Sequence, residues 1–222
     1  MKILLLGPPR PEIIQHITER GDEVKVTEKK LCLETPLIQE TDFLISYGYH
    51  HILKPDILGN FPNKAINIHI SLLPWNRGAD PNLWSFLEDT PKGVTIHYLD
   101  EGIDTGPVVA RRTVEFETPK LTTFREAHTY LRAQAEDLFW GTFDAFLDGS
   151  LSPTPQMGIG SFHRVQDLPL AFRGWDEPIL DEVTRLRSWE RTVQERAEGL
   201  IDAIEEVRRS NNVNWMNLLR LA

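Results

Sequence analysis

Short apolar runs on either side of a helical segment constrain the fold of the first part of the chain. Residues 2–6 (KILLL) are closed by Gly7, and residues 24–26 (VKV) form a second short run. Between them, residues 11–20 begin with a proline and are followed by Gly21, the usual signals for the start and end of a helix. A strand, a helix and a second strand at this spacing predict two parallel strands joined by a right-handed crossover.

Further apolar runs continue this pattern, with predicted strands at residues 42–47, 65–70, 94–99 and 108–116. A short helix is predicted at residues 55–61, and a long one at residues 122–147, where the apolar positions follow helical spacing. The fold class that follows is α/β, with a Rossmann-like, mostly parallel sheet flanked by helices.

The first turn of this fold lacks the features of a dinucleotide site. Residues 7–11 read GPPRP rather than G-x-G-x-x-G, and prolines remove the backbone N–H groups that would hold a pyrophosphate. A metal site is not expected either. The adjacent His50 and His51 point to opposite faces of an extended segment, and no cysteine or carboxylate at ligand spacing completes a set.

Charge and cysteine content limit the partners and the compartment. The formal net charge of −9 over 222 residues argues against a general nucleic-acid-binding protein. Cys32 is the only cysteine, so no internal disulfide forms and a reducing compartment is favoured. The apolar N-terminus is too short for a signal peptide, and no apolar run approaches the roughly 18 residues of a membrane span. We expect a cytoplasmic protein with no nucleic-acid or membrane partner.

Polar side chains interrupt the strand predicted at residues 65–70. Asn67 and His69 are two residues apart and share one face of it. The next strand leads into an acidic loop that contains Asp104. An amide, an imidazole and a carboxylate at strand ends are the components of an acyl-transfer site. Taken alone, the Asn67 and His69 pair fits the outward face of an amphipathic strand equally well.

The loop after Pro74 offers a second candidate binding element. Arg77 beside Gly78 suits an anionic or hydroxyl-rich substrate, although a solvated surface arginine fits equally well. Asp80 is predicted to cap a helix at residues 82–88.

Two linked motifs resemble those of the tetrahydrofolate-dependent formyltransferases. They are NIHxSLLP at residues 67–74 and HxxxxxxDxG at residues 97–106. This family includes the glycinamide ribonucleotide, methionyl-tRNA and sugar N-formyltransferases, and the resemblance covers most of residues 1–150. The continuation PWNRGxxPxxW at residues 74–84 resembles the sugar-modifying branch. The resemblance implies the formyltransferase fold.

The resemblance also implies a mechanism. An acceptor amine would attack the formyl carbon of the cosubstrate N10-formyltetrahydrofolate. Asn67 would donate to the developing oxyanion, worth about 3 kcal/mol by analogy with other oxyanion donors. His69 would transfer the proton or act as a second donor, and Asp104 would orient the imidazole or take the proton itself. Both routes stay open, and His97 is expected only to support the site.

Two sets of binding residues follow from the same resemblance. The backbone of two segments would hold the pterin, giving His51, Ile52, Leu53, Leu99, Asp100, Gly102 and Ile103 as cofactor-binding residues. Gly102 would allow the backbone to approach the ligand closely. The acceptor would be bound by the loop residues Trp75, Asn76, Arg77 and Gly78. No metal is implied.

The expected acceptor is a nucleotide-linked amino dideoxy sugar used for surface polysaccharide. Methionyl-tRNA formylation normally comes with a C-terminal β-barrel and a basic surface, and glycinamide ribonucleotide formylation with a Gly/Ser-rich loop after the first strand. Both stay as alternatives, as does a non-catalytic formyltransferase-like binding module.

The C-terminal part is predicted to form a separate unit. Residues 1–155 are expected to form the catalytic domain and residues 156–222 a small helical appendage. Residues 179–209 are highly charged with scattered apolar positions, typical of a surface or dimer-contact helix. Residues 211–221, which include Trp215, are expected to dock on the body or on a partner. A homodimer and a monomer with a docked tail both remain open.

Overall fold

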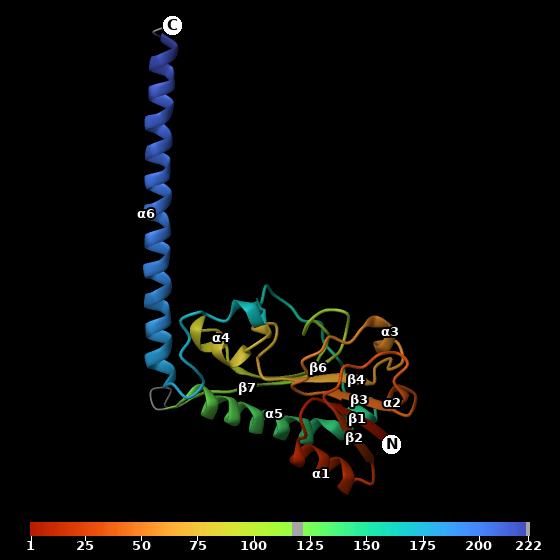
Figure 1. The fold of residues 1–222 in the computed structure, drawn as a ribbon. Coiled ribbons are helices and arrows are strands. Elements are labelled where there is room, and N and C mark those ends of the chain that lie inside the picture. Colours follow the sequence, from red (N-terminus) through yellow and green to blue (C-terminus); the bar gives the residue numbers. More distant parts are fainter. Residues whose placement is uncertain (117–121, 221–222) are drawn as a thin grey trace.

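A six-stranded sheet forms the centre of the molecule (Figure 1). The structure is a computed structural model that describes residues 1–116 and 122–220, and side chains as far as residue 211. The strand order is β2-β1-β3-β4-β6-β7. The parallel strands are β1 (Lys2–Leu6), β2 (Glu23–Thr27), β3 (Phe43–Ser46) and β4 (Ala65–His69), and the antiparallel ones are β6 (Gly93–Tyr98) and β7 (Val108–Thr113). The predicted mostly parallel α/β fold is confirmed, with a mixed sheet because two antiparallel strands complete one edge.

Helices cover both faces of the sheet. α1 (Pro11–Glu19) and α5 (Phe124–Leu147) lie against one face, below the sheet in Figure 1. The short helices α2 (Pro36–Gln39) and α3 (Pro55–Leu58) pack on the opposite face, and α4 (Pro81–Leu87) packs beside the first turns of α5. Because both faces are covered, β1 and β3 are largely apolar on both sides.

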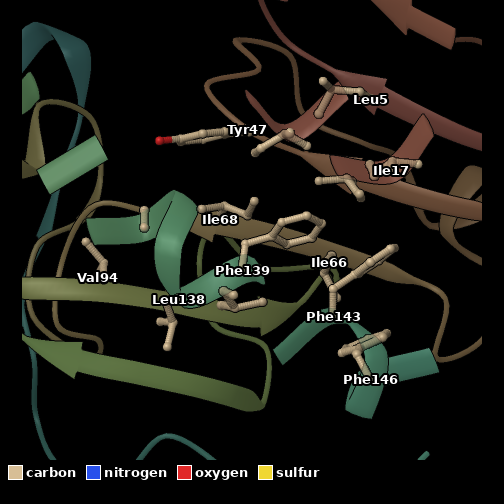
Figure 2. Close-up of a cluster of buried hydrophobic side chains, with 14 of the residues drawn as sticks. Leu5, Ile17, Tyr47, Ile66, Ile68, Val94, Leu138, Phe139, Phe143 and Phe146 are labelled. Carbon is tan, nitrogen blue, oxygen red and sulfur yellow. The ribbon is translucent and has the colours of Figure 1, made fainter. Parts of the chain in front are cut away.

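The direction of the side chains alternates along β4, and this determines where the polar residues point. Ile66 and Ile68 pack against the aromatic side chains of α5, among them Phe139 and Phe143 (Figure 2). Successive strand residues point to opposite faces. Asn67 therefore points to the other face, the one that carries α2 and α3.

Two predicted helix starts have different outcomes. α5 begins after Thr123 in a capping box: the Thr123 Oγ1 accepts from the Glu126 N–H at 3.2 Å, and the Glu126 carboxylate accepts from the Thr123 N–H at 2.8 Å. Asp80 occupies the N-cap position of α4, as predicted, but the expected side-chain cap is missing. Asp80 precedes α4 with a φ of +50°, and its side chain makes no cap hydrogen bond.

Residues 156–178 lie against the body of the molecule. β8 (Phe162–His163) pairs in parallel with β5 (Arg77–Gly78), two very short strands that the sequence pattern does not predict. A 3-10 turn at Val165–Asp167 follows. The domain division at residues 155 and 156 stays a prediction.

The last helix, α6 (Ile179–Arg220), is longer than expected. Ile179, Val183 and Leu186 are buried against α4 and the start of α5, and the rest of the helix stands away from the body (Figure 1). The predicted docking of Trp215 and its neighbours lies outside the described side chains. None of the helices in the described part of the chain is long and apolar enough to cross a membrane.

Candidate active site

A cavity of about 740 Å³ opens at the carboxyl ends of β3 and β4. Ligands of open α/β sheets bind at this edge, outside the ends of the parallel strands. The cavity is lined by the three predicted catalytic residues Asn67, His69 and Asp104. The structure therefore brings the strand residues and the acidic loop together.

The Asp104 carboxylate lies at the centre of this group. Its Oδ1 accepts a hydrogen bond from the Asn67 amide nitrogen at 2.9 Å, and its Oδ2 accepts one from the Gly78 N–H at 2.8 Å. The Asp104 backbone has a φ of +53°, and its carbonyl accepts a hydrogen bond from the Gln156 side chain at 2.8 Å. Contacts from three separate segments thus hold this residue, two at its side chain and one at its backbone.

The surroundings of Asp104 favour its charged form. Burial would raise the pKa of the carboxyl, but the charge of His69, the hydrogen bond and charge of His97, and the Gly78 N–H together hold the pKa well below its usual range. The group stays ionised at neutral pH. A carboxylate with so low a pKa is a weak proton acceptor.

His69 is oriented by a backbone carbonyl. Its ring is buried, and Nε2 lies 3.0 Å from the carbonyl oxygen of Asn76. A carbonyl oxygen can only accept, so Nε2 carries a hydrogen and Nδ1 is the basic nitrogen of the neutral ring. Nδ1 lies 3.7 Å from the Asp104 Oδ2. A proton taken up at Nδ1 would therefore lie beside a carboxylate.

His97 contacts the group more directly than expected. It lies opposite Asn67 in the register of β4 and β6, and its Nδ1 donates to the Tyr98 carbonyl at 2.7 Å. Its Nε2 is 3.2 Å from the Asn67 amide nitrogen and 3.4 Å from the Asp104 Oδ1. The neutral ring accepts from Asn67, whereas the protonated ring donates to Asp104 and leaves one Asn67 N–H free.

The residues predicted to bind the cofactor line the same cavity. They are His51, Ile52, Leu53, Leu99, Asp100, Gly102 and Ile103. The structure gives a reason for the glycine that lies within the loop, and its close approach to a ligand stays a prediction. A Cβ at Gly102 would lie 1.9 Å from the Thr105 Oγ1, because the Thr105 hydroxyl and the Gly102 N–H both donate to the Asp100 carboxylate. Glycine is thus required by the loop itself.

Of the four residues predicted to bind the acceptor, only Gly78 lines the cavity. Trp75 and Arg77 lie outside its lining. The Asn76 side chain is completely buried, and it donates to the Thr90 hydroxyl at 2.7 Å and accepts from the Ser161 hydroxyl at 3.0 Å. The Asn76 side chain thus stabilises its own loop, and the Asn76 carbonyl orients His69.

Gln156 is a site residue that the sequence analysis misses. Its amide donates to the carbonyls of Asp104 and Gly106, at 2.8 and 2.9 Å. It comes 52 residues after Asp104 and belongs to no motif, so no sequence signal points to it. Among the described residues, no group of three histidine, cysteine, aspartate or glutamate side chains could hold a metal ion.

Comparisons with known families and with solved structures both find formyltransferases. The sequence matches the Formyl transferase family over residues 25–131. It is similar to the formyltransferase PseJ from Anoxybacillus kamchatkensis, with 44% identity, a TM-score of 0.76, and coverage of 81% of this chain and 96% of that chain. That protein was crystallised in complex with UDP-4,6-dideoxy-4-formamido-L-AltNAc and tetrahydrofolate.

Two curated relatives are named for acceptors other than a sugar. A methionyl-tRNA formyltransferase from Clostridium botulinum is 29% identical over 81% of this chain and 58% of its own length. A phosphoribosylglycinamide formyltransferase from Bacillus subtilis is 32% identical over 52% of this chain and 65% of its own length. The chain thus spans less than two thirds of the length of both relatives.

Proposed function

Because the chain belongs to the formyl transferase family, we propose that it moves the formyl group of N10-formyltetrahydrofolate to the amine of a nucleotide-linked amino sugar. The observation that supports this acceptor most is the 44% identity over 96% of a formyltransferase crystallised with a formamido UDP-sugar and tetrahydrofolate. Cytoplasmic surface-polysaccharide synthesis is the pathway in which we place the product.

The folate would lie between the two cofactor segments. Ile52 is 69% exposed and Ile103 is 41% exposed, and both line the cavity. A flat ring that covered two large exposed apolar side chains would gain hydrophobic stabilisation. They line the same cavity as Asn67, so a pterin bound there would carry its formyl group in the cavity that holds the catalytic residues.

The proposed chemistry begins with attack of the acceptor amine on the formyl carbon. Negative charge then develops on the formyl oxygen, and the Asn67 N–H that does not bind Asp104 donates to it in place of its contact with His97. The attacking nitrogen loses a proton as the C–N bond forms, and the bond from the formyl carbon to N10 breaks while N10 takes up a proton. The products are a formamido sugar and tetrahydrofolate.

We assign the proton transfer to His69 rather than to Asp104. The Nδ1 of His69 is the free base of a ring whose other nitrogen is held by the Asn76 carbonyl. Asp104 has both carboxylate oxygens engaged by N–H donors, from Asn67 and Gly78. Its role is then to stabilise the imidazolium that forms at His69.

Methionyl-tRNA is the second candidate acceptor. It is supported by the relative from Clostridium botulinum, which matches 81% of this chain. The net charge of −9 opposes it, since binding of a tRNA depends on a basic surface that neutralises phosphates.

The test is an acceptor panel with one cosubstrate. The protein is incubated with N10-formyltetrahydrofolate and, separately, with nucleotide-linked amino sugars, initiator methionyl-tRNA and glycinamide ribonucleotide, and release of tetrahydrofolate is followed by absorbance. We expect formylation of at least one amino sugar and of neither other acceptor. Formylation of the tRNA alone would overturn the sugar assignment. Folate binding without formylation of any acceptor would favour a non-catalytic module.

A further inference from the structure

One wall of the active-site cavity contains two arginines and a histidine that the proposed chemistry does not use. Arg10 follows β1, and His128 and Arg132 lie on α5, and all three line the cavity. The Arg10 guanidinium lies over the Tyr47 ring, with 4.5 Å from its Cζ to the ring centroid. Tyr47 is a buried member of the apolar cluster in Figure 2, and it also lines the cavity.

Two of these guanidinium groups are incompletely paired. The Nε atoms of Arg10 and Arg132 are buried and have no hydrogen-bond partner among the described residues. Buried polar N–H groups are nearly always hydrogen-bonded, so each of these donors needs a partner that a ligand could supply.

Positive charge also exceeds negative charge at this wall. The carboxylate of Glu136 is buried and accepts from the Arg132 Nη2 at 3.3 Å. Burial lowers the pKa of Arg10, and the charge of Arg132 lowers it further. The pKa of His128 is lowered by partial burial and then by the charges of Arg132, Arg10 and Arg125. Among the described residues, Glu136 is thus the one buried carboxylate near these two guanidinium groups, and Glu12, which also attracts Arg10, is exposed to solvent, so an anion would restore the balance within the cavity.

The chemistry of the wall indicates which anion it suits. A guanidinium presents several N–H donors in a rigid fork that matches phosphate oxygens. The turn at residues 7–11 contains three prolines, which have no N–H, so its backbone cannot form a cradle for phosphate. The side chain of Arg10 supplies donors in the place where that backbone lacks them.

We propose that Arg10 and Arg132, with His128 beside them, bind the diphosphate of the nucleotide-linked acceptor. This assignment rests on the proposed function, because it names the part of the proposed acceptor that the wall would hold. It differs from the prediction made from the sequence, which assigned the acceptor to the loop at residues 75–78. In the structure, three of those four residues lie outside the cavity lining.

The test measures equilibrium binding without turnover. Calorimetry with the full chain compares UDP, UMP, uridine and inorganic pyrophosphate, with tetrahydrofolate as a second ligand that reports an intact cavity. We expect UDP to bind more tightly than UMP and uridine, and pyrophosphate to compete with UDP. Arg10→Gln and Arg132→Gln should each weaken UDP binding by about 10- to 100-fold, as for loss of charged hydrogen bonds, with tetrahydrofolate binding unchanged.

Two further variants separate charge from folding. Glu136→Gln removes the opposing carboxylate and should tighten UDP binding, which a general loss of structure would not do. Arg112→Gln is the matched control, because Arg112 pairs with Asp137 outside the cavity, and it should change UDP affinity by less than about two-fold.

The outcomes distinguish this assignment from the proposed function. Formylation of an amino sugar by Arg10→Gln and Arg132→Gln with unchanged KM and UDP affinity would overturn the diphosphate site alone. Tighter binding of UMP or glycinamide ribonucleotide than of UDP would show that the wall binds a phosphate monoester. That result would also overturn the assignment of a diphosphate site. Arginine-dependent binding of UDP and pyrophosphate, with no amino sugar formylated, would support the site and overturn only the proposed acceptor.

Discussion

At the scale of single residues, His69 is the group whose removal should affect catalysis most directly. Its Nδ1 is the proposed base, and its Nε2 is fixed by the Asn76 carbonyl. We expect His69→Ala to lower kcat by about 100- to 10,000-fold, the usual contribution of a positioned general base, with little change in thermal stability. Added imidazole should restore part of the rate, since it fits the space that the side chain leaves.

A histidine outside the cavity provides the control for this variant. His16 lies on α1 against the ring of Trp140, with 6.2 Å between the ring centroids. His16→Ala should keep the wild-type kcat. Near-normal turnover in both His69→Ala and Asp104→Ala, measured by tetrahydrofolate release, would contradict the assignment of the site.

The backbone N–H of Gly78 donates to the Asp104 carboxylate, and this contact leads to a second prediction. It has a φ of +88°, and a Cβ there would lie 2.2 Å from the His163 carbonyl oxygen. Gly78→Ala should therefore separate β5 from β8 and displace the N–H that holds Asp104. We expect kcat to fall at least about 10-fold, since displacing a group at a reacting centre by 1 Å can cost about 100-fold.

The matched control is Gly141→Ala, in α5, where a Cβ would meet no atom within 4 Å. Alanine favours helix over glycine by about 1 kcal/mol, so this variant should be as active as wild type and slightly more stable. Thermal melting and steady-state turnover of both variants decide the point. A fully active Gly78→Ala would show that the hydrogen bond to Asp104 is dispensable.

The sequence predicts part of the site because strand residues obey a simple rule. Asn67 and His69 are two apart in a strand, so they share a face wherever that strand lies. Asn76 lies in a loop with a φ of +54°, where no such periodicity applies, and its side chain turns inward to Thr90. The contribution of Gln156 depends on how a later segment returns over the sheet, which is a tertiary contact without a local signal.

At the scale of elements, a buried carboxylate attaches α6 to the segment before it. The Glu182 side chain is fully buried, and it accepts from the Arg173 and Arg185 Nε atoms at 2.8 and 2.9 Å and from the Arg173 N–H at 2.9 Å. The hydrogen bond with Arg185, followed by those with Arg173, outweighs burial and lowers the pKa of Glu182 to about 2.

This shift predicts how stability depends on pH. The pKa is lower in the folded state than its ordinary 4.5, so the stabilisation is fully present above about pH 4.5 and is lost as the pH falls toward about 2. Glu182→Gln should cost about 3 kcal/mol of unfolding free energy at pH 7, and the difference from wild type should shrink across that window.

Urea denaturation at a series of pH values measures this difference. Glu206→Gln is the control, because Glu206 and its partner Arg209 are both 69% exposed, and an exposed ion pair contributes about 0.5 kcal/mol or less. Equal effects of the two variants, or an effect of Glu182→Gln that persists unchanged at pH 2, would contradict the assignment.

The elements that the sequence predicts are those with strong periodic patterns. β1, α1, β3, β4 and α5 are long or strongly apolar, and their predicted positions agree with the structure to within a few residues. β5 and β8 contain two residues each, and they exist because residues 161–163 return to Arg77 and Gly78. Such a pairing has no pattern within either segment.

At the scale of the whole molecule, α6 presents an apolar face that the body does not cover. Val193, Leu200, Ile204 and Val207 are 44%, 63%, 50% and 60% exposed. Together with Ala197 and Asn211, they follow one another at alternating spacings of four and three residues, the repeat of a coiled coil. A helix of this length with an uncovered apolar stripe is marginal in water.

We expect a second copy of this chain to cover that face. In a parallel, in-register pair, the Asn211 side chains of the two copies would meet at a core position, where identical asparagines satisfy each other. The wild-type protein should then sediment at twice the 25.5 kDa of one chain. Leu200→Asp and Ile204→Asp should give monomers, because each places a charge in the dimer core.

Thr192→Asp adds the same charge on the outer face of α6, where the side chain is exposed, and should remain dimeric. Every lining residue of the active-site cavity precedes α6, so the monomeric variants should keep the kcat and KM of the wild type. Sedimentation equilibrium with parallel turnover assays tests both statements. A monomeric wild type would contradict the pairing, and monomeric variants with little activity would show that the second copy supports the site.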